Sequence, residues 1–353
     1  MWLRPFSLSL ASPLGTAGGE ITDRTGLLVG LSVDGQRGIG EATPLAGWTE
    51  SNEACRHTLE AMADTDCDDL PGLAEPTETP AAAHAVDLAI QDARARCAGK
   101  RLAGWLRQQA DISGSPPDSV PINATIGDGD LEATVSAATD ALEQGYEWLK
   151  LKVGARELSA DIERIRTVER TVGDRAQIRL DANGAWSRTQ ATRVLEEIAE
   201  YDIAYLEQPL AADDLEGLAA LRGRGTDIAV DESLAAYSLA EIKAARAADV
   251  IVIKPMAVGG PTRALEAAIA GRNAGIEPVV TTTIDAVVAR TAAVHVAAAI
   301  PDVTACGLAT GSLLENDLTA DPVDIADGRA LVPSGSGLCG GGFEGLWAAN
   351  GCE

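Results

Sequence analysis

Residues 148–153 read WLKLKV, an alternating segment with a lysine at every second position from 150. Side chains two residues apart on a β-strand point to the same side, so Lys150 and Lys152 share one face while Leu149, Leu151 and Val153 share the other. The apolar face is suited to packing against helices, which leaves two amines on the opposite face. Buried like charges are unfavourable without partners. The segment therefore predicts a buried strand whose neighbours carry carboxylates.

Short apolar runs of this kind recur along the chain from residue 121, each followed by a helical pattern. The runs are Pro121–Thr125, Trp148–Val153, Gln177–Asp181, Ala204–Gln208, Ile228–Glu232, Val250–Lys254, Pro278–Thr282 and Val303–Leu308. Strands that alternate with helices indicate a parallel sheet, and eight such units predict a (β/α)8 barrel. An open doubly wound sheet normally shows G-x-G-x-x-G after its first strand, and none of these runs is followed by that fingerprint.

Charged groups end five consecutive runs of this series. The endings are Lys150-Leu151-Lys152, Asp181-Ala182-Asn183, Glu207-Gln208-Pro209, Asp231-Glu232-Ser233 and Lys254-Pro255. Any one carboxylate at a strand end is more often a helix cap, but the carboxyl ends of barrel strands meet at one mouth, where active sites lie. Asp181, Glu207 and Asp231 would form an all-oxygen site suited to Mg²⁺. A metal flanked by lysines indicates proton abstraction next to a carboxylate, with the metal stabilising the enediolate.

The first third of the chain lacks the regular alternation of apolar runs and helical patterns. Leu27–Val33 reads as a strand, Asp34-Gly35 as a hairpin turn, and helices are predicted from Ser51 and over Ala81–Ala98. The Gly/Ser/Pro-rich segment Ser113–Asp118 is the best candidate boundary. We expect an α+β capping domain over residues 1–115, a barrel over 116–319, and a tail, 320–353, that packs back on the first domain. The glycines of residues 335–342 lack the lysine of a phosphate-binding loop and predict a flexible turn.

Composition limits the classes of function. The 353 residues are 46% apolar and carry 53 acidic against 28 basic side chains, a net charge of −25. Such a chain is globular and repels nucleic acid and anionic membranes. The acidic residues are scattered, which favours adaptation to high salt over an acidic partner-binding face. Only five lysines occur, and three of them end barrel strands.

Location and covalent chemistry are also constrained. The sequence contains no run of 18 apolar residues, which argues against a membrane span. Its start lacks the features of a signal peptide, so a cytoplasmic protein is expected. The six cysteines form no C-x-x-C pair, which argues against a zinc site and favours buried or free thiols. The oligomeric state stays open, a homo-oligomer included.

The set K-x-K, D-x-N, E-Q-P, D-E-S and K-P on successive strands resembles the enolase superfamily, in its muconate-lactonizing branch, over nearly the whole chain. Gly40–Trp48 resembles the capping-domain loop that closes over the substrate in that branch. The helix Ala85–Ala98 with the segment to Leu106 resembles the part that precedes its barrel. The resemblance implies a barrel with a capping domain and a small-molecule carboxylate as the substrate.

The resemblance also implies roles for single residues. Asp181, Glu207 and Asp231 would bind Mg²⁺, for which Mn²⁺ would be a substitute. Lys152 would be the base on one face of the substrate, Lys254 the lysine on the other, and Lys150 an auxiliary amine. Asn183 would lie beside the metal, and Trp48 would cover the substrate.

Strands seven and eight distinguish branches of the family. The mandelate racemase branch carries a histidine on strand seven, where this chain has Thr281, Thr282 and Thr283, and His295 is expected in the core. These threonines, with Gly307 and Leu308, resemble the substrate contacts of o-succinylbenzoate synthases. The implied reaction dehydrates 2-succinyl-6-hydroxy-2,4-cyclohexadiene-1-carboxylate to o-succinylbenzoate in menaquinone biosynthesis. The alternatives are a racemase of N-succinylamino acids, a dipeptide epimerase, or an inactive acidic scaffold, which the intact carboxylates and lysines disfavour.

Overall fold

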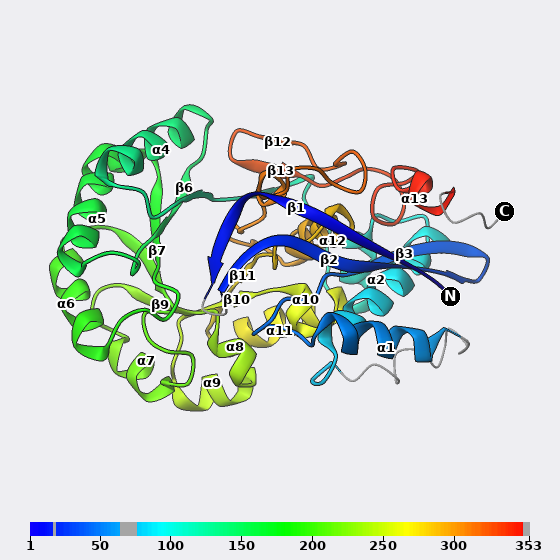
Figure 1. Cartoon of the computed structure of the whole chain (residues 1–353), viewed down its shortest axis with the longest axis horizontal. Coiled ribbons are helices and arrows are strands. Elements are labelled where there is room, and N and C mark those ends of the chain that lie inside the picture. The colour runs from blue at the N-terminus through cyan, green and yellow to red at the C-terminus, as the bar shows by residue number, and fades with distance from the viewer. Residues whose placement is uncertain (17–18, 64–75, 349–353) are drawn as a thin grey trace.

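The structure is a computed structural model that describes residues 1–16, 19–63 and 76–348. Figure 1 shows a curled sheet ringed by helices, with a smaller sheet and the chain ends beside it. The first sheet is parallel and the second antiparallel. This agrees with the predicted barrel and α+β capping part.

The capping sheet has the strand order β1-β2-β3, formed by β1 (Trp2–Thr16), β2 (Gly19–Val33) and β3 (Gln36–Ala42). Asp34 and Gly35 join β2 to β3 with φ values of 49° and 77°. Two positive φ values in a two-residue loop are the signature of a type I′ turn, which matches the twist of the strands it joins. The hairpin predicted from Asp34-Gly35 is thereby confirmed.

Three helices follow the capping sheet: α1 (Asn52–Met62), α2 (Pro80–Cys97) and α3 (Leu102–Gln109). The hydroxyl of Ser51 accepts from the amide of Ala54 and caps α1, as predicted. α2 lies so close to β3 that a Cβ on Gly38 or Gly40 would stand 1.9 Å from a main-chain oxygen of the helix. Glycine at these positions lets the helix pack directly on the strand.

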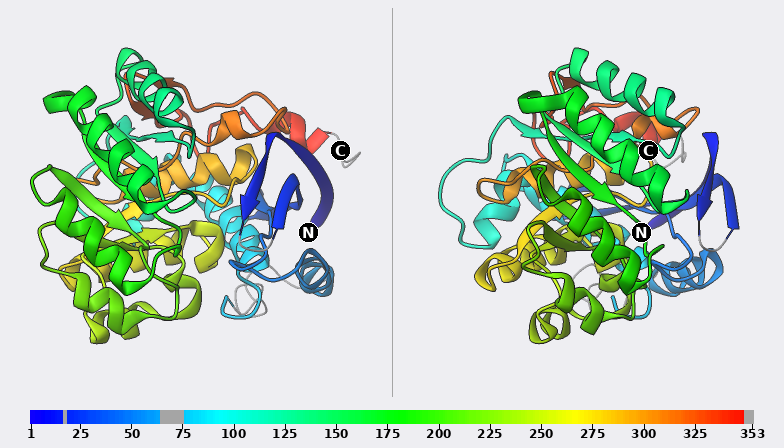
Figure 2. Two further views of the ribbon diagram at one scale, coloured as in Figure 1. Left: turned by 60° about the vertical axis from the view of Figure 1, so that its left-hand side comes forward. Right: turned by 90° about the vertical axis from the view of Figure 1, so that its left-hand side faces the viewer.

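The barrel sheet has seven strands in the order β11-β10-β9-β8-β7-β6-β5. They are β5 (Ala124–Ile126), β6 (Trp148–Lys152), β7 (Gln177–Asp181), β8 (Ile203–Glu207), β9 (Asp227–Val230), β10 (Val250–Ile253) and β11 (Glu277–Val280). On β6, Leu149 and Leu151 are fully buried, as the alternation of leucine and lysine predicts. Helices pack outside the ring (Figure 2), and β6 to β11 each follow a helical segment, whereas β5 follows the short strand β4 (Ser119–Pro121).

An eighth segment closes the ring between the first and last strands. Cys306 pairs in parallel with Ile122, and Gly307 pairs with Thr281 at the end of β11. The segment makes these isolated bridges without forming a strand of its own. The predicted run Val303–Leu308 therefore takes the place of the eighth strand of the barrel and pairs with its neighbours through two isolated bridges.

Helices follow the seven strands on the outside of the barrel. The main ones are α4 (Leu131–Glu143), α5 (Leu158–Val172), α6 (Arg188–Ile198), α7 (Leu215–Leu221), α9 (Leu239–Ala245), α11 (Pro261–Asn273) and α12 (Val287–Ala299). The single turns α8 (Ser233–Ala236) and α10 (Pro255–Val258) precede α9 and α11, and the 3-10 turn η2 (Gly173–Arg175) follows α5.

The expected eighth helix is missing from the described part of the chain. The eighth segment is followed by the 3-10 turn η3 (Gly311–Leu313). The physical reason lies in α12, which is apolar and wholly buried because it packs against α3, α11 and β3. The capping part thus covers the barrel where an eighth helix would otherwise pack.

The tail returns to both parts of the molecule. β12 (Ile325–Ala326) and β13 (Arg329–Leu331) form a small sheet with β4 (Ser119–Pro121). The short helix α13 (Glu344–Ala348) brings Trp347 edge-on to Trp2 of β1, with ring centroids 5.2 Å apart. The division at residues 115 and 319 stays a proposal.

Histidines and cysteines play structural parts in the described residues. His295 is fully buried on α12, as predicted; its Nε2 donates to the carbonyl of Leu338 at 2.7 Å. Cys55, Cys97, Cys306 and Cys339 are free thiols; Cys67 and Cys352 lie outside the described residues. Among the helices that the structure describes, none has the length and apolar character needed to cross a membrane.

Candidate active site at the barrel mouth

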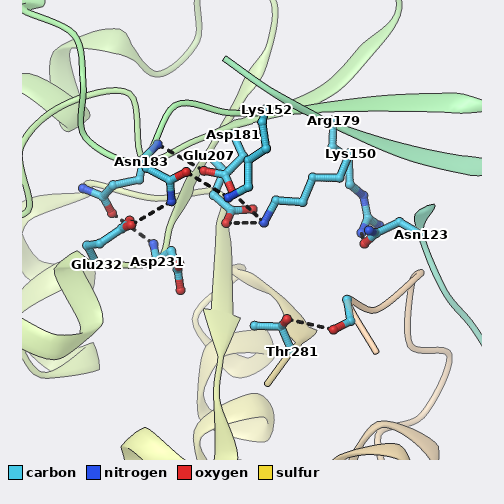
Figure 3. Close-up of polar contacts among 12 residues, drawn as sticks. Asn123, Lys150, Lys152, Arg179, Asp181, Asn183, Glu207, Asp231, Glu232 and Thr281 are labelled. Atoms are coloured by element: carbon cyan, nitrogen blue, oxygen red, sulfur yellow. Dashed lines mark hydrogen bonds and ion pairs between the residues drawn. The ribbon is translucent and has the colours of Figure 1, made fainter. Parts of the chain in front are cut away.

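Register places the functional side chains of neighbouring strands side by side. Lys152 at the end of β6 pairs with Asp181 at the end of β7, which pairs with Glu207 at the end of β8. Asp231 follows β9, and Lys254 follows β10. Because parallel strands end at one rim, the charged side chains at these strand ends come together in one site, part of which Figure 3 shows.

The amines and carboxylates of this site form a connected network. Lys150 Nζ lies 2.8 Å from Asp181 Oδ2 and 2.6 Å from Glu207 Oε1. Lys152 Nζ lies 2.7 Å from the same Asp181 oxygen, and Lys254 Nζ lies 2.7 Å from Asp231 Oδ2. The carboxylates predicted as partners of the lysines are thus in contact with them.

Charge pairing sets the ionisation of this network. Burial opposes the charge of Lys150, but Asp181 and Glu207 outweigh it and raise its pKa well above the ordinary value, so Lys150 is held as a cation. Burial also opposes ionisation of Asp181, yet Lys150 and Lys152 lower the pKa of that carboxyl. For Glu207, burial and then the charge of Asp181 raise the pKa. The raised pKa of Glu207 means that the nearby lysines do not fully stabilise the ionised form of this carboxyl.

Buried oxygens without partners test whether a cation fits here. Glu207 Oε2, Asp231 Oδ1 and Glu232 Oε2 are buried with no hydrogen-bond donor. Buried polar atoms are normally satisfied, so such oxygens point to a missing ion. Within the described residues, no three Asp, Glu, His or Cys side chains are already arranged as a ligand cluster, and each predicted ligand gives one oxygen to a lysine. The donor chemistry nevertheless fits a hard divalent cation.

Neighbouring polar residues align the site. Asn183 Oδ1 accepts from Lys152 Nζ at 2.8 Å, and Asn183 Nδ2 donates to Glu232 Oε1 at 3.0 Å. Gln208 Oε1 accepts from the amides of Asp231 and Ser233 at 3.0 and 3.1 Å. The side chain that follows Glu207 in sequence therefore ties the end of β8 to the segment that carries Asp231.

Lys152 and Lys254, the two outer lysines of the site, have unequal surroundings. The ring of Trp48 lies over Lys254, with Nζ 3.1 Å from the ring centroid, a cation–π contact. Lys254 is enclosed, with 10% of its side chain exposed, whereas 34% of the Lys152 side chain is exposed. The loop predicted to cover the mouth thus touches a predicted catalytic lysine.

The predicted substrate contacts of strands seven and eight lie at the same rim. The Thr281 hydroxyl donates to the carbonyl of Gly307 at 2.8 Å, and the Thr282 and Thr310 hydroxyls lie 2.9 Å apart. The Thr283 hydroxyl donates a hydrogen bond to the carboxylate of Asp285. Leu308 is buried, with 1% exposure. Their contacts with substrate stay predictions.

Sequence reasoning missed three residues near this site. Glu232 stands next to Asp231 in the D-E-S motif, so its sequence position was a usable signal. Arg24 and Glu41 come from the capping sheet and are buried against the barrel. Their partners on the barrel lie more than 200 residues away in sequence, at Ile284 and Ala286, and a local sequence pattern does not predict contacts at that separation.

Comparisons with known proteins agree with this geometry. The family described as "Enolase C-terminal domain-like" matches residues 133–340. Chloromuconate cycloisomerase CbnB of Cupriavidus necator is 30% identical over 330 residues, 88% of this chain and 87% of that protein. The o-succinylbenzoate synthase of Thermobifida fusca is 36% identical over 211 residues, which are 58% of this chain and 64% of that protein.

A solved structure matches over almost the whole length. The dipeptide epimerase from Methylococcus capsulatus, complexed with Mg and the dipeptide L-Arg-D-Lys, superposes with a TM-score of 0.82 at 30% identity. The match covers 96% of this chain and 98% of that one. The similarity therefore includes the capping part as well as the barrel.

Proposed function

This chain belongs to the enolase superfamily, and we propose that it is an o-succinylbenzoate synthase, a lyase that dehydrates 2-succinyl-6-hydroxy-2,4-cyclohexadiene-1-carboxylate in menaquinone biosynthesis. The observation that supports a lyase is the inequality of the two outer lysines. Lys152 is accessible at the mouth, while Lys254 is enclosed by Trp48 and Asp231. A syn elimination needs one base that later returns the proton, so unequal lysines suit it.

The proposed reaction uses Lys152 twice. Its neutral amine removes the proton next to the ring carboxylate, and the electron pair of the broken C–H bond enters an enediolate. The carbon–oxygen bond to the ring hydroxyl then breaks, the leaving oxygen takes the proton back from Lys152, and water departs as the ring becomes aromatic. Lys150 and Lys254 place positive charge near the developing oxyanion.

Mg²⁺ is the cofactor of this proposal, with Mn²⁺ as a substitute, and Asp181, Glu207 and Asp231 are its ligands. When bound, the ion supplies positive charge that stabilises the enediolate oxygens. The orphaned oxygens of Glu207 and Asp231 support this assignment, as does the Mg in the similar epimerase structure.

The second candidate is a racemase or epimerase, an isomerase of the same family. The solved dipeptide epimerase covers 96% of this chain, whereas the synthase relative covers 58%. Lys152 on β6 and Lys254 just after β10, in separate parts of the barrel, also provide the two amines that inversion of a stereocentre requires.

One comparison of substrates tests the proposal. Purified protein with Mg²⁺ is assayed on the cyclohexadiene carboxylate, on N-succinylamino acids, on dipeptides and on chloromuconate, and kcat/KM is compared. We expect the highest value on the cyclohexadiene carboxylate. A higher value on any of the other substrates would overturn the proposed function.

A further inference from the structure

The seam between the capping sheet and the barrel is crossed by one buried guanidinium. Arg24 of β2 is 3% exposed. Its Nη2 donates to the carbonyl of Thr43 at 2.7 Å and its Nη1 to that of Pro44 at 2.9 Å. Its Nε donates to the carbonyl of Ile284 at 3.1 Å. One side chain therefore fixes two loops that are far apart in sequence.

The first loop leads from Arg24 to a predicted catalytic lysine. After Pro44, the amide of Trp48 donates to the carbonyl of Leu45 at 3.0 Å, which makes a tight turn. The Trp48 ring then rests on Lys254. Displacement of the Pro44 carbonyl would be transmitted through this short turn to the indole.

The second loop joins the end of β11 to α12. Ile284 has a φ of 60°, in the left-handed region, which a β-branched residue rarely adopts. Such a conformation persists only where the surroundings hold it, and such strain is concentrated at functional sites. The amide of Ile284 donates to the Thr282 hydroxyl at 3.3 Å, and Arg24 holds its carbonyl.

A second residue of the capping sheet supports the same loop. Glu41 is fully buried; its Oε1 accepts from the amide of Ala286 and its Oε2 from that of Ala289, both at 2.8 Å. This carboxylate caps the amino end of α12 from another part of the fold. Burial lowers the pKa of the nearby Arg24 guanidinium, and the charges of Asp285 and Glu41 oppose that shift, so the cation and the two acidic residues lie in one buried cluster at the seam.

From this geometry we propose that Arg24 is a positioning residue for the reaction. It sets the place of the Trp48 turn relative to the Thr281–Ile284 loop at the barrel mouth. A residue that only filled the seam could be apolar, but binding three carbonyls requires donors at three nitrogens in a rigid planar group. The inference deepens the proposed function and relies on it for the choice of substrate.

The first test compares Arg24→Met and Arg24→Lys with a matched variant, Asp87→Ala. Asp87 of α2 binds the amide and hydroxyl of Thr262, both at 2.9 Å, and so holds capping part and barrel together at a different contact. We expect both Arg24 variants to lose about 100-fold in kcat/KM, because small displacements of positioned groups have effects of that order. Asp87→Ala should keep kcat/KM near the wild-type value at a lower Tm. An equal loss in Asp87→Ala would overturn the inference.

A rescue variant separates positioning from general damage. Asparagine adopts the left-handed region more readily than isoleucine, so Ile284→Asn should let the loop keep its shape without Arg24. We expect Ile284→Asn to restore about tenfold of kcat/KM in the Arg24→Met background, a coupling typical of residues in contact. No restoration would contradict a role through Ile284.

A measurement without substrate keeps this inference apart from the proposed function. In Arg24→Met, hydrogen exchange should become faster at the amides of residues 45–49 and 284–289 and stay unchanged in β7 and β8, while Asp87→Ala should leave both loops protected. If the wild type fails on the cyclohexadiene carboxylate, the proposed function falls and the exchange result alone decides on Arg24. Unchanged exchange in the two loops of Arg24→Met would overturn its positioning role.

Discussion

Lys152 and Lys254 contact different kinds of neighbours, and this difference can be tested by substitution. Lys152→Ala should lower kcat for dehydration by about 10²- to 10⁴-fold, the usual contribution of a general base. Lys254→Arg keeps the positive charge but cannot deprotonate near neutral pH. In a one-base lyase, we expect Lys254→Arg to retain measurable dehydration in a steady-state assay.

The control for this pair is the racemisation reaction. Exchange of the α-proton of N-succinylamino acids with solvent, followed by NMR, reports which lysine acts as a base on each enantiomer. A Lys254→Arg variant that loses dehydration completely while still exchanging one enantiomer would contradict the one-base mechanism and support the racemase.

The predicted metal site makes a second test at the residue scale. Removal of divalent ions with EDTA should abolish activity, and Mg²⁺ or Mn²⁺ should restore it. Glu207→Gln should weaken Mg²⁺ binding measured by calorimetry, because it removes the charge of a buried ligand. Activity that persists in chelator, or unchanged Mg²⁺ affinity in Glu207→Gln, would contradict the assignment.

The pattern of single residues was more informative about the barrel than about the seam. The alternation of Lys150 and Lys152 predicted an inward face, and the structure brings both amines against Asp181. Their catalytic roles stay predictions. Arg24 could not be found in this way, because its three acceptors are main-chain carbonyls, and any residue type supplies a carbonyl.

At the scale of elements, α12 depends on a histidine that must stay neutral. The amide of Ala103 donates to His295 Nδ1 at 3.3 Å, and Nε2 donates to the carbonyl of Leu338. Burial lowers the pKa of His295 to about 4. The unfolded chain therefore binds a proton near pH 6.5 that the folded chain takes up only near pH 4.

The resulting pH dependence has a definite sign. Stability from neutral His295 is complete above pH 6.5 and is lost as the pH falls toward 4, by about 3 kcal/mol in all. Burial also lowers the pKa of His84, which therefore makes the folded state less stable as the pH falls. Burial and the charge of Asp285 raise the pKa of Glu41 to about 7, so Glu41 changes the stability in the opposite direction.

Comparison with one variant isolates the His295 contribution. Glutamine can accept and donate in the same places without titrating, so His295→Gln should show a smaller fall in the free energy of unfolding between pH 6.5 and 4. Urea titrations of both proteins at each pH measure the difference. Parallel curves would show that His295 does not cause the dependence.

The predicted elements agreed with the structure wherever a local pattern carried the information. Ser51 capped a helix and Asp34-Gly35 made a turn because caps and turns depend on neighbouring residues. The prediction of an eighth helix was wrong, because α3 and β3 of the capping part pack against α12. Which part of a fold covers another is settled by packing between distant segments, and a local pattern does not record it.

The whole molecule carries a net charge of −25, and its effect on stability depends on salt. Like charges repel over a screening length of about 30 Å at 0.01 M salt, which falls to about 3 Å at 1 M. The compact state brings the acidic side chains closer together than the unfolded chain does, so repulsion destabilises folding most in dilute buffer. We expect Tm to rise markedly from 0.01 M to molar KCl.

Sucrose at matched osmolarity separates screening from preferential exclusion, because sucrose screens no charge. An equal rise in sucrose, or a flat Tm in KCl, would contradict adaptation to salt through surface charge, whereas a rise confined to KCl would support it.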